Sequence, residues 1–165
     1  MIAKVILLAS LLALTEVSGA DQLNATGVFT QLQTLVGNWE GKTEAGRVFK
    51  VNYRLVAKNT VLVETWTLGP QRETLTLYHM DNDALIATHY CALGNQPRLR
   101  LKEGGRASSF IFEFVSATNL PKPEIEHQHR FEIEILQPNS FARSETYVKN
   151  GTAETERVVY SRTGG

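Results

Sequence analysis

Three of the four histidines of the chain, His89, His127 and His129, are the side chains best suited to chemistry. His127 and His129 are two residues apart, and on a β-strand this spacing points both imidazoles to the same side. A third imidazole beside them would complete a three-nitrogen centre for zinc or iron. Neutral imidazoles could equally hold the polar end of a small molecule. The residues therefore favour a histidine-lined site for a ligand or a divalent metal.

The segments that carry these histidines are predicted to be β-strands. Runs that alternate apolar and polar residues recur along the chain, at about 39–43, 48–56, 61–68, 74–80, 85–92, 98–102, 110–117, 127–136, 140–148 and 154–162. Turn residues separate them, including Asp81-Asn82-Asp83 and Asn150-Gly151, and Asn-Gly is a strong hairpin signal. Short connections predict an antiparallel meander. Closing it removes exposed edges, so the expected all-β fold is a closed up-and-down barrel of about ten strands.

One short helix is expected before the first strand. Apolar residues at helical spacing run from Gly27 to Val36, and Gly37 is suited to ending a helix. We expect this helix to cap one end of the barrel.

The apolar alternation also predicts which side chains face the barrel interior. Leu62, Trp66, Phe112 and Phe114 are expected to line an internal apolar cavity. Glu64 shares its face with Leu62 and Trp66. The remaining residues expected to point inward are all four histidines, the cysteine and two leucines of the fourth strand, namely His79, His89, His127, His129, Cys91, Leu75 and Leu77.

Successive turns of a meander alternate between the two ends of a barrel, and this places the polar residues. His89, His127, His129, Cys91 and Trp66 are expected at the open mouth. Asn95 and Gln96 are expected beside them, with Glu64 behind as an acceptor that orients one imidazole. His79 is expected more than about 10 Å further down the barrel, at about 3.3 Å per residue. Ligand binding by neutral imidazoles should weaken as the pH falls through about 6.5.

The stretch around His89 resembles the signature of an uncharacterised family of small calycin-like, or lipocalin-like, barrel domains. The residues that carry the resemblance are Tyr78-His79, Thr88-His89-Tyr90-Cys91 and Gly94-Asn95-Gln96-Pro97-Arg98. Gly37-Asn38-Trp39 is similar to the G-x-W motif that opens calycin barrels. The resemblance implies that Trp39 packs across the closed end, beneath Arg162 of the last strand. It also implies that the barrel binds a small apolar or amphiphilic molecule.

The ten-strand pattern also resembles the nitrobindin-type barrels, which bind haem through a histidine near the C-terminus. No histidine follows His129 here, so the resemblance does not supply that ligand, and haem is not expected.

Composition and length set the remaining expectations. Seventeen basic and seventeen acidic residues cancel, which argues against a nucleic-acid partner. Residues 1–20 combine Lys4, an apolar run and a Ser18-Gly19-Ala20 site, as in a secretory signal peptide. A secreted or periplasmic single domain at 21–165, with no membrane span, is expected. Asn24 and Asn150 begin glycosylation triplets.

The function classes can then be compared. No G-x-S-x-G motif surrounds a serine, and Cys91 beside His89 on one strand face is a poor catalytic pair, so the residues argue against a hydrolase. The preferred hypothesis is a small-molecule-binding barrel, monomeric or weakly dimeric. A three-histidine metal centre, with or without enzymatic activity, is the alternative. A barrel whose internal polar network serves structure alone is the third.

Overall fold

The computed structural model describes residues 23–67, 69, 72–102 and 108–164 of the 165-residue chain. The proposed signal peptide lies outside them. The elements are α1 (Ala25–Gln33), β1 (Gly37–Lys42), β2 (Val48–Val56), β3 (Val61–Thr67), β4 (Glu73–Asp81), β5 (Ala84–Tyr90), β6 (Gln96–Leu101), β7 (Ser109–Thr118), β8 (His127–Gln137), β9 (Ser140–Lys149) and β10 (Thr152–Thr163).

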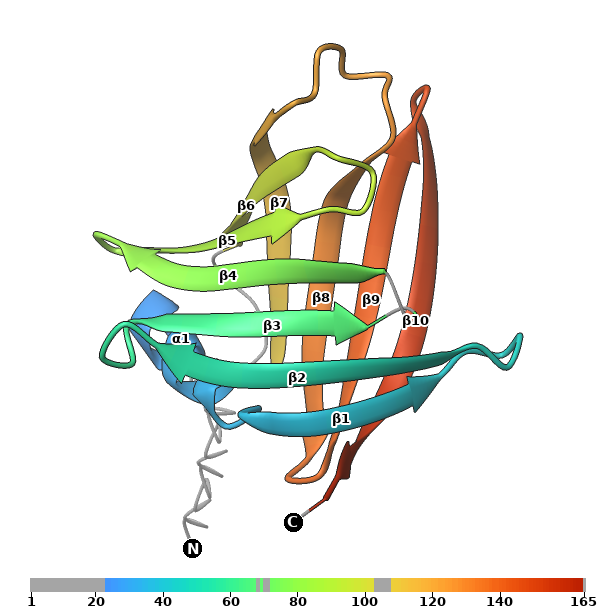
Figure 1. The fold of residues 1–165 in the computed structure, drawn as a ribbon. Helices are drawn as coiled ribbons and strands as arrows, with labels where there is room; N and C mark the ends of the chain where they lie inside the picture. Colours follow the sequence, from blue (N-terminus) through green and yellow to red (C-terminus); the bar gives the residue numbers. More distant parts are fainter. Residues whose placement is uncertain (1–22, 68, 70–71, 103–107, 165) are drawn as a thin grey trace, which may run out of the picture.

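The ten described strands form one closed antiparallel barrel. Each strand pairs with its neighbours in sequence, and β10 returns to pair with β1, where Trp39 lies opposite Arg162. Figure 1 shows β1 to β4 crossing β8 to β10 at a steep angle, as expected when a twisted sheet closes on itself. The predicted all-β, up-and-down barrel with a short helix before its first strand is confirmed.

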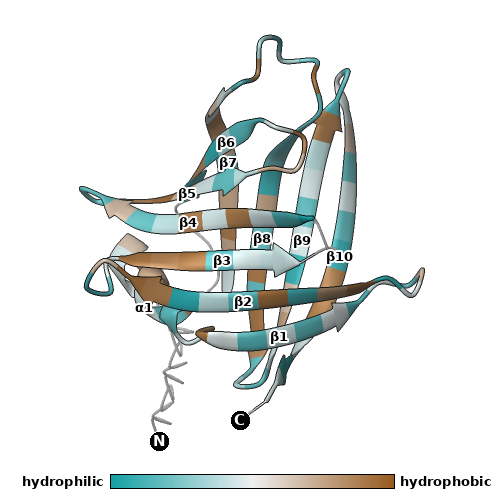
Figure 2. Ribbon diagram, viewed as in Figure 1, coloured by the Kyte–Doolittle hydropathy of each residue, from teal (hydrophilic) through white to brown (hydrophobic). Residues whose placement is uncertain are grey.

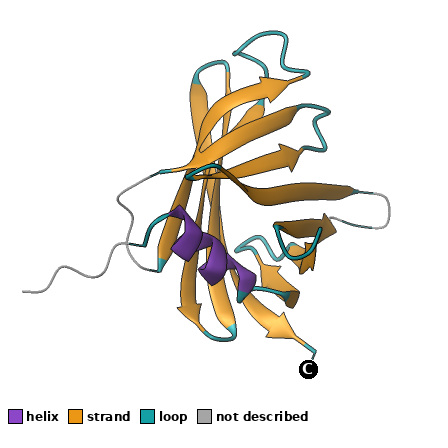
Figure 3. Ribbon diagram, turned by 90° about the vertical axis from the view of Figure 1, so that its left-hand side faces the viewer, coloured by secondary structure: helices purple, strands orange, loops and turns teal. Residues whose placement is uncertain are grey.

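Helix α1 lies across one end of the barrel, beside the β2–β3 and β4–β5 turns (Figures 1 and 3). The Asn24 side chain caps its first turn by accepting a 2.8 Å hydrogen bond from the Gly27 amide. Phe29 and Leu32 on its inner face are buried in the barrel core. The helix ends at Gln33, three residues earlier than predicted, so Val36 is exposed instead of packed. Within the described residues, no helix has the length and hydrophobicity needed to cross a membrane.

Trp39 and Arg162 close this end of the barrel, as the G-x-W resemblance implied. The Trp39 indole is buried, and its Nε1 donates a 2.7 Å hydrogen bond to the Leu35 carbonyl. The Arg162 guanidinium lies 4.2 Å from the centre of the indole ring. It also donates to the Val36 and Thr34 carbonyls, at 2.7 and 2.9 Å. These contacts join the last strand to the end of the helix.

Gly37 makes room for that guanidinium. Its φ angle is +130°, and a Cβ at this position would lie 2.6 Å from Arg162 Nη1. A side chain here would both strain the backbone and displace the arginine.

Hydrophobic and hydrophilic residues alternate along many of the strands (Figure 2), but the inward face of β4 was predicted wrongly. Thr74, Thr76 and Tyr78 are buried and face the interior, whereas Leu75, Leu77 and His79 are only half-buried on the other face. Because the outer face of β4 also carries leucines, apolar alternation alone assigns its two faces the wrong way round.

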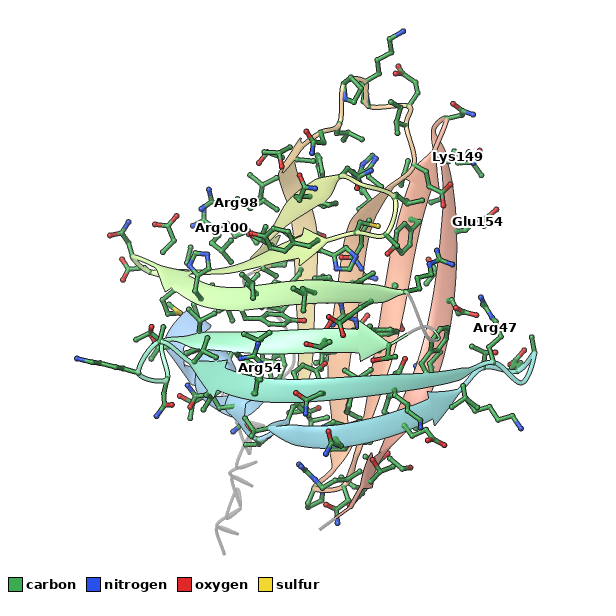
Figure 4. All side chains as sticks on the ribbon, viewed as in Figure 1. Arg47, Arg54, Arg98, Arg100, Lys149 and Glu154 are labelled. Carbon is green, nitrogen blue, oxygen red and sulfur yellow. The ribbon has the colours of Figure 1, made fainter. Side chains whose placement is uncertain are left out.

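Val63 and Ile86 point to the outer side of the barrel, yet both are buried. Arg54 is paired opposite Val63, and Arg100 opposite Ile86. Both arginines project from the outer face of the barrel (Figure 4). The alkyl parts of long basic side chains cover apolar surface while their charges stay in water.

The closed end gives a first prediction. Replacing Arg162 by Met keeps an apolar chain over Trp39 but removes two charge-assisted hydrogen bonds to backbone carbonyls, and it should lower the free energy of unfolding by about 1.5–3 kcal/mol. Arg157→Met, in the same strand, removes only an exposed ion pair with Glu134 and should cost below about 1 kcal/mol. Urea denaturation of both variants measures the difference. Equal stabilities would contradict the role given to Arg162.

Candidate functional site

A pocket of about 730 Å³ opens at the end of the barrel away from the helix. Its wall comes from the connections between β1 and β2, β3 and β4, and β5 and β6, with the strand residues next to them. The second half of β9 and the first half of β10 complete it. Arg47 and Glu154 mark this end in Figure 4. The residues that line it are Arg47, Val48, Phe49, Trp66, Arg72, Thr74, His89, Cys91, Ala92, Leu93, Glu126, Arg143, Glu145, Tyr147, Glu154, Thr155, Glu156 and Val158.

Glu64 lies at the centre of a polar network in the barrel interior. It is fully buried on β3. Its two carboxylate oxygens accept five hydrogen bonds of 2.6–3.1 Å, which come from Tyr53, Trp66, Thr76, Tyr78 and Arg143. A buried carboxylate is stable only when its oxygens are satisfied in this way.

Arg143 of β9 supplies the positive charge of the network and is also fully buried. Its Nη1 donates to Glu64 at 2.6 Å and to the Tyr78 hydroxyl at 2.8 Å, and its Nε donates to Glu145 at 3.0 Å. The guanidinium lies 4.1 Å from the centre of the Phe131 ring. Burial acts to lower the pKa of Arg143, but Glu64 and the other neighbours raise it well above its ordinary value. The guanidinium is therefore permanently charged.

Glu145 is the second carboxylate beside Arg143, and it sits closer to the pocket, with its side chain 20% exposed. Its Oε1 accepts from Arg143 Nε and, at 2.9 Å, from Gln128 Nε2. Burial raises the pKa of Glu145, although Arg143 opposes the shift. One arginine thus serves two carboxylates.

His89 is buried on β5 at the edge of this network. Its Nδ1 is 3.0 Å from Thr76 Oγ1, which also lies 3.1 Å from Glu64 Oε1. The Thr76 hydroxyl has one proton, and donating it to the carboxylate is the favourable choice, because hydrogen bonds to charged groups are stronger. Nδ1 of His89 then carries the ring proton and donates it to Thr76. The other nitrogen, Nε2, is left as an acceptor with a free lone pair.

The electrostatic environment keeps that lone pair available. Burial lowers the pKa of His89 from its ordinary value of 6.5 to about 4, and the positive charge of Arg143 adds to the effect. The imidazole is therefore neutral near pH 7. The expected loss of binding near pH 6.5 does not apply to His89, because this ring protonates only in more acidic solution.

Two buried nitrogens of residues that line the pocket have no hydrogen-bond partner in the part of the chain that the structure describes. Among the described residues, five buried side-chain polar atoms lack a hydrogen bond, and they include His89 Nε2 and Arg143 Nη2. Both residues line the pocket. One atom is an acceptor and the other a donor, so together they can bind a group that offers both functions.

His127 and His129 do not join His89, and the predicted convergence is wrong. A β-bulge in β8 between Gln128 and Arg130 shifts the alternation by one residue. Gln128 therefore reaches the interior and bonds Glu145. The two histidines contact each other instead, with His127 Nε2 3.2 Å from His129 Nδ1. Neither lines the pocket.

The proposed three-histidine metal centre therefore lacks its ligand set. In residues 23–67, 69, 72–102 and 108–164, no three His, Cys, Asp or Glu side chains are grouped as a metal ion requires. Glu64 also does not orient these rings directly, since its contact with His89 passes through Thr76.

The other predicted site residues divide into two groups. Trp66 and Cys91 line the pocket as expected. Asn95 and Gln96 do not, because Asn95 donates to the Glu126 carbonyl and Gln96 accepts from Thr118, which braces the loop before β8. Cys91 Sγ lies 4.0 Å from the Tyr147 hydroxyl, and burial raises the pKa of its thiol, so a reactive thiolate is not favoured.

The predicted apolar lining is also largely misplaced. Leu62 and Phe112 are fully buried in the packed core, and Phe114 stacks on His129 at 5.3 Å between ring centres. None of the three lines the pocket. The pocket lining therefore combines buried polar residues, among them His89 and Arg143, with apolar side chains such as Phe49, Trp66 and Val158.

Several network residues were missed by reasoning from the sequence, above all Arg143 and Glu145. A signal was present, because Phe141, Arg143, Glu145 and Tyr147 alternate in β9 and therefore share one face. An inward-facing Glu64 requires a buried cation. Arg143 was the candidate for it, because it shares a face of β9 with the aromatic residue Phe141.

Comparisons with known proteins give the fold alone. No protein-family model matches the chain, and neither does any curated protein. The solved structures that are similar include two proteins. One is a protein of unknown function from the DUF3598 family of Nostoc punctiforme, with 13% identity and a TM-score of 0.53 over 81% of this chain. The chain spans about half (49%) of that protein.

The second is Rv2717c from M. tuberculosis, with 14% identity and a TM-score of 0.50, covering 87% of this chain and 100% of that protein. Both are barrel proteins, and identities this low support the barrel without assigning a function.

The ion pair at the centre of the network yields a prediction. Arg143→Met and Glu64→Gln should each lower the free energy of unfolding by about 3–5 kcal/mol, because each leaves a buried group without its partner. The double variant should be more stable than the sum of these losses implies, by at least about 1 kcal/mol. The matched cycle on the exposed Lys102–Glu113 pair should give a coupling below about 1 kcal/mol. Additive losses at Glu64 and Arg143 would contradict the network.

Proposed function

We propose that this protein binds a small amphiphilic molecule in the pocket at the open end of its barrel. The polar end of the molecule enters first and meets His89 and Arg143. The apolar part fills the outer pocket. The calycin-like resemblance of the chain is consistent with this function, since barrels of that kind commonly bind small molecules.

The observation that carries the proposal is the pair of unpartnered nitrogens. Leaving a buried polar atom without a hydrogen bond costs about 1–3 kcal/mol, and a charged group costs more. Arg143 Nη2 belongs to a charged guanidinium, and His89 Nε2 belongs to a ring whose other nitrogen is already bonded. A ligand that satisfies both atoms would recover this free energy on binding.

The size and walls of the pocket suit such a ligand. Its volume of about 730 Å³ falls within the range of about 300–1,000 Å³ that small-molecule sites occupy. Trp66 and Phe49 lie in its wall with ring centres 5.6 Å apart, and Val158 lines it from β10. These side chains offer apolar contact to the body of a ligand.

Export is part of the same proposal. The predicted signal peptide at 1–20 would place the mature domain in a secreted or periplasmic setting. A lone cysteine provides no internal disulfide there, so the barrel would depend on its packed core and its buried network for stability.

Nile red, a neutral dye whose emission rises in apolar surroundings, tests the proposal. Wild-type protein should bind it saturably at one molecule per chain. Thr74→Trp should weaken binding by at least about tenfold, because Thr74 lines the pocket and the larger ring fills it.

Leu75→Trp is the matched control, since the neighbouring residue in β4 points to the other face of the strand. It should bind the dye like wild type. Equal effects of the two substitutions, or no saturable binding by the wild type, would refute a ligand site in this pocket.

A further inference from the structure

The charges around the pocket disfavour an anionic ligand. Three arginines and four glutamates line it, which are Arg47, Arg72, Arg143, Glu126, Glu145, Glu154 and Glu156. Two of the arginines already bind carboxylates of the protein. Arg47 pairs with Glu156 at 2.6 Å, and Arg143 is shared between Glu64 and Glu145.

Arg143 in particular is not an open anion site. Its Nη1 and Nε already donate to two carboxylates, which leaves Nη2 as the nitrogen without a partner. A ligand carboxylate at Nη2 would be the third negative group around one positive charge. Like charges crowded in a poorly solvated site repel strongly, so this arrangement is unfavourable.

His89 further restricts the polar group that a ligand can place in the pocket. Because Nδ1 carries the ring proton and donates it in a hydrogen bond to Thr76, Nε2 presents a lone pair to a group that binds beside it. A carboxylate oxygen next to that lone pair has no proton to share with it. A hydroxyl or an amide N–H does, and such a donor would form a normal hydrogen bond with the ring.

We propose that the polar end of the ligand is uncharged and carries an O–H or N–H donor beside an oxygen acceptor, as in an alcohol or a primary amide. The donor forms a hydrogen bond to His89 Nε2, and the acceptor accepts a hydrogen bond from Arg143 Nη2. This inference rests on the proposed function, because it specifies the ligand class of the same pocket.

Four probes with the same phenylpropyl body test the inference against wild-type protein. They are 3-phenylpropan-1-ol, 3-phenylpropanamide, 3-phenylpropanoate and the methyl ether of the alcohol. Dissociation constants are measured by NMR titration, in which the indole N–H signal of Trp66 reports binding in the pocket. The alcohol and the amide should bind at least about tenfold more tightly than the carboxylate. The ether, which accepts but does not donate, should bind about tenfold more weakly than the alcohol.

Two outcomes overturn the inference while leaving the proposed function intact. One is a carboxylate that binds as tightly as the alcohol, and the other is an ether that matches the alcohol. Failure of all four probes to bind in the pocket would refute the proposed function itself, and the inference with it.

A variant pair assigns the effect to His89. His89→Phe keeps a ring of similar shape but removes the acceptor, so the preference for alcohol over ether should disappear. His129→Phe, on an exposed ring outside the pocket, should leave that preference unchanged. A preference that survives in His89→Phe would overturn the role given to this ring. The ranking of the four probes on the wild type tests the ligand class even if His89→Phe fails to fold.

Discussion

The buried ion pair between Glu64 and Arg143 constrains the whole interior of this barrel. Two charges removed from water cost several kcal/mol each unless hydrogen bonds and opposite charges replace the lost hydration. The residues around Glu64 and Arg143 supply these replacements. Two tyrosines, a tryptophan and a threonine donate to the carboxylate, and aromatic rings cover the guanidinium. The strands that carry these residues must therefore keep one register.

The same network shapes the pocket above it. Because the Thr76 hydroxyl donates to Glu64, it accepts from His89 Nδ1, and the lone pair of His89 Nε2 is left without a partner among the described residues. Because Nη1 and Nε of Arg143 donate to Glu64 and Glu145, only Nη2 remains to donate to a molecule in the pocket. In the function proposed here, structural stability and ligand recognition are two consequences of one set of hydrogen bonds. The closed end of the barrel, by contrast, depends on Trp39 and Arg162.

Much of the fold was predictable because it depends on local patterns. Alternating residues and turn signals gave ten strands in meander order, and the short connections gave antiparallel pairing. Asn82 and Asn150 adopt positive φ angles in the turns where they were expected. The direction of the meander also placed His89, Cys91 and Trp66 at the open end correctly. Each inference used residues close together in the sequence.

The candidate site was harder to predict, because it depends on long-range contacts and on one irregularity. The bulge in β8 moved His127 and His129 off the interior face, and alternation has no means of detecting a bulge. Apolar residues on the outside of β4 reversed its apparent inner face. Glu64 and Arg143 lie 79 residues apart, so their pairing required the barrel register. The prediction relied on the histidines, whereas Arg143 and Glu145 complete the candidate site.

The protonation state of His89 is the most direct test of this account. NMR of protein labelled with ¹⁵N at histidine, with the His89 signals assigned through a His89→Gln variant, reports which ring nitrogen carries the proton at each pH. The network predicts a neutral ring at pH 7 with its proton on Nδ1. It also predicts that the pKa of His89 is about 4, because burial and the charge of Arg143 disfavour protonation. A proton on Nε2, or a midpoint near the ordinary histidine value of about 6.5, would contradict the network and the acceptor it places in the pocket.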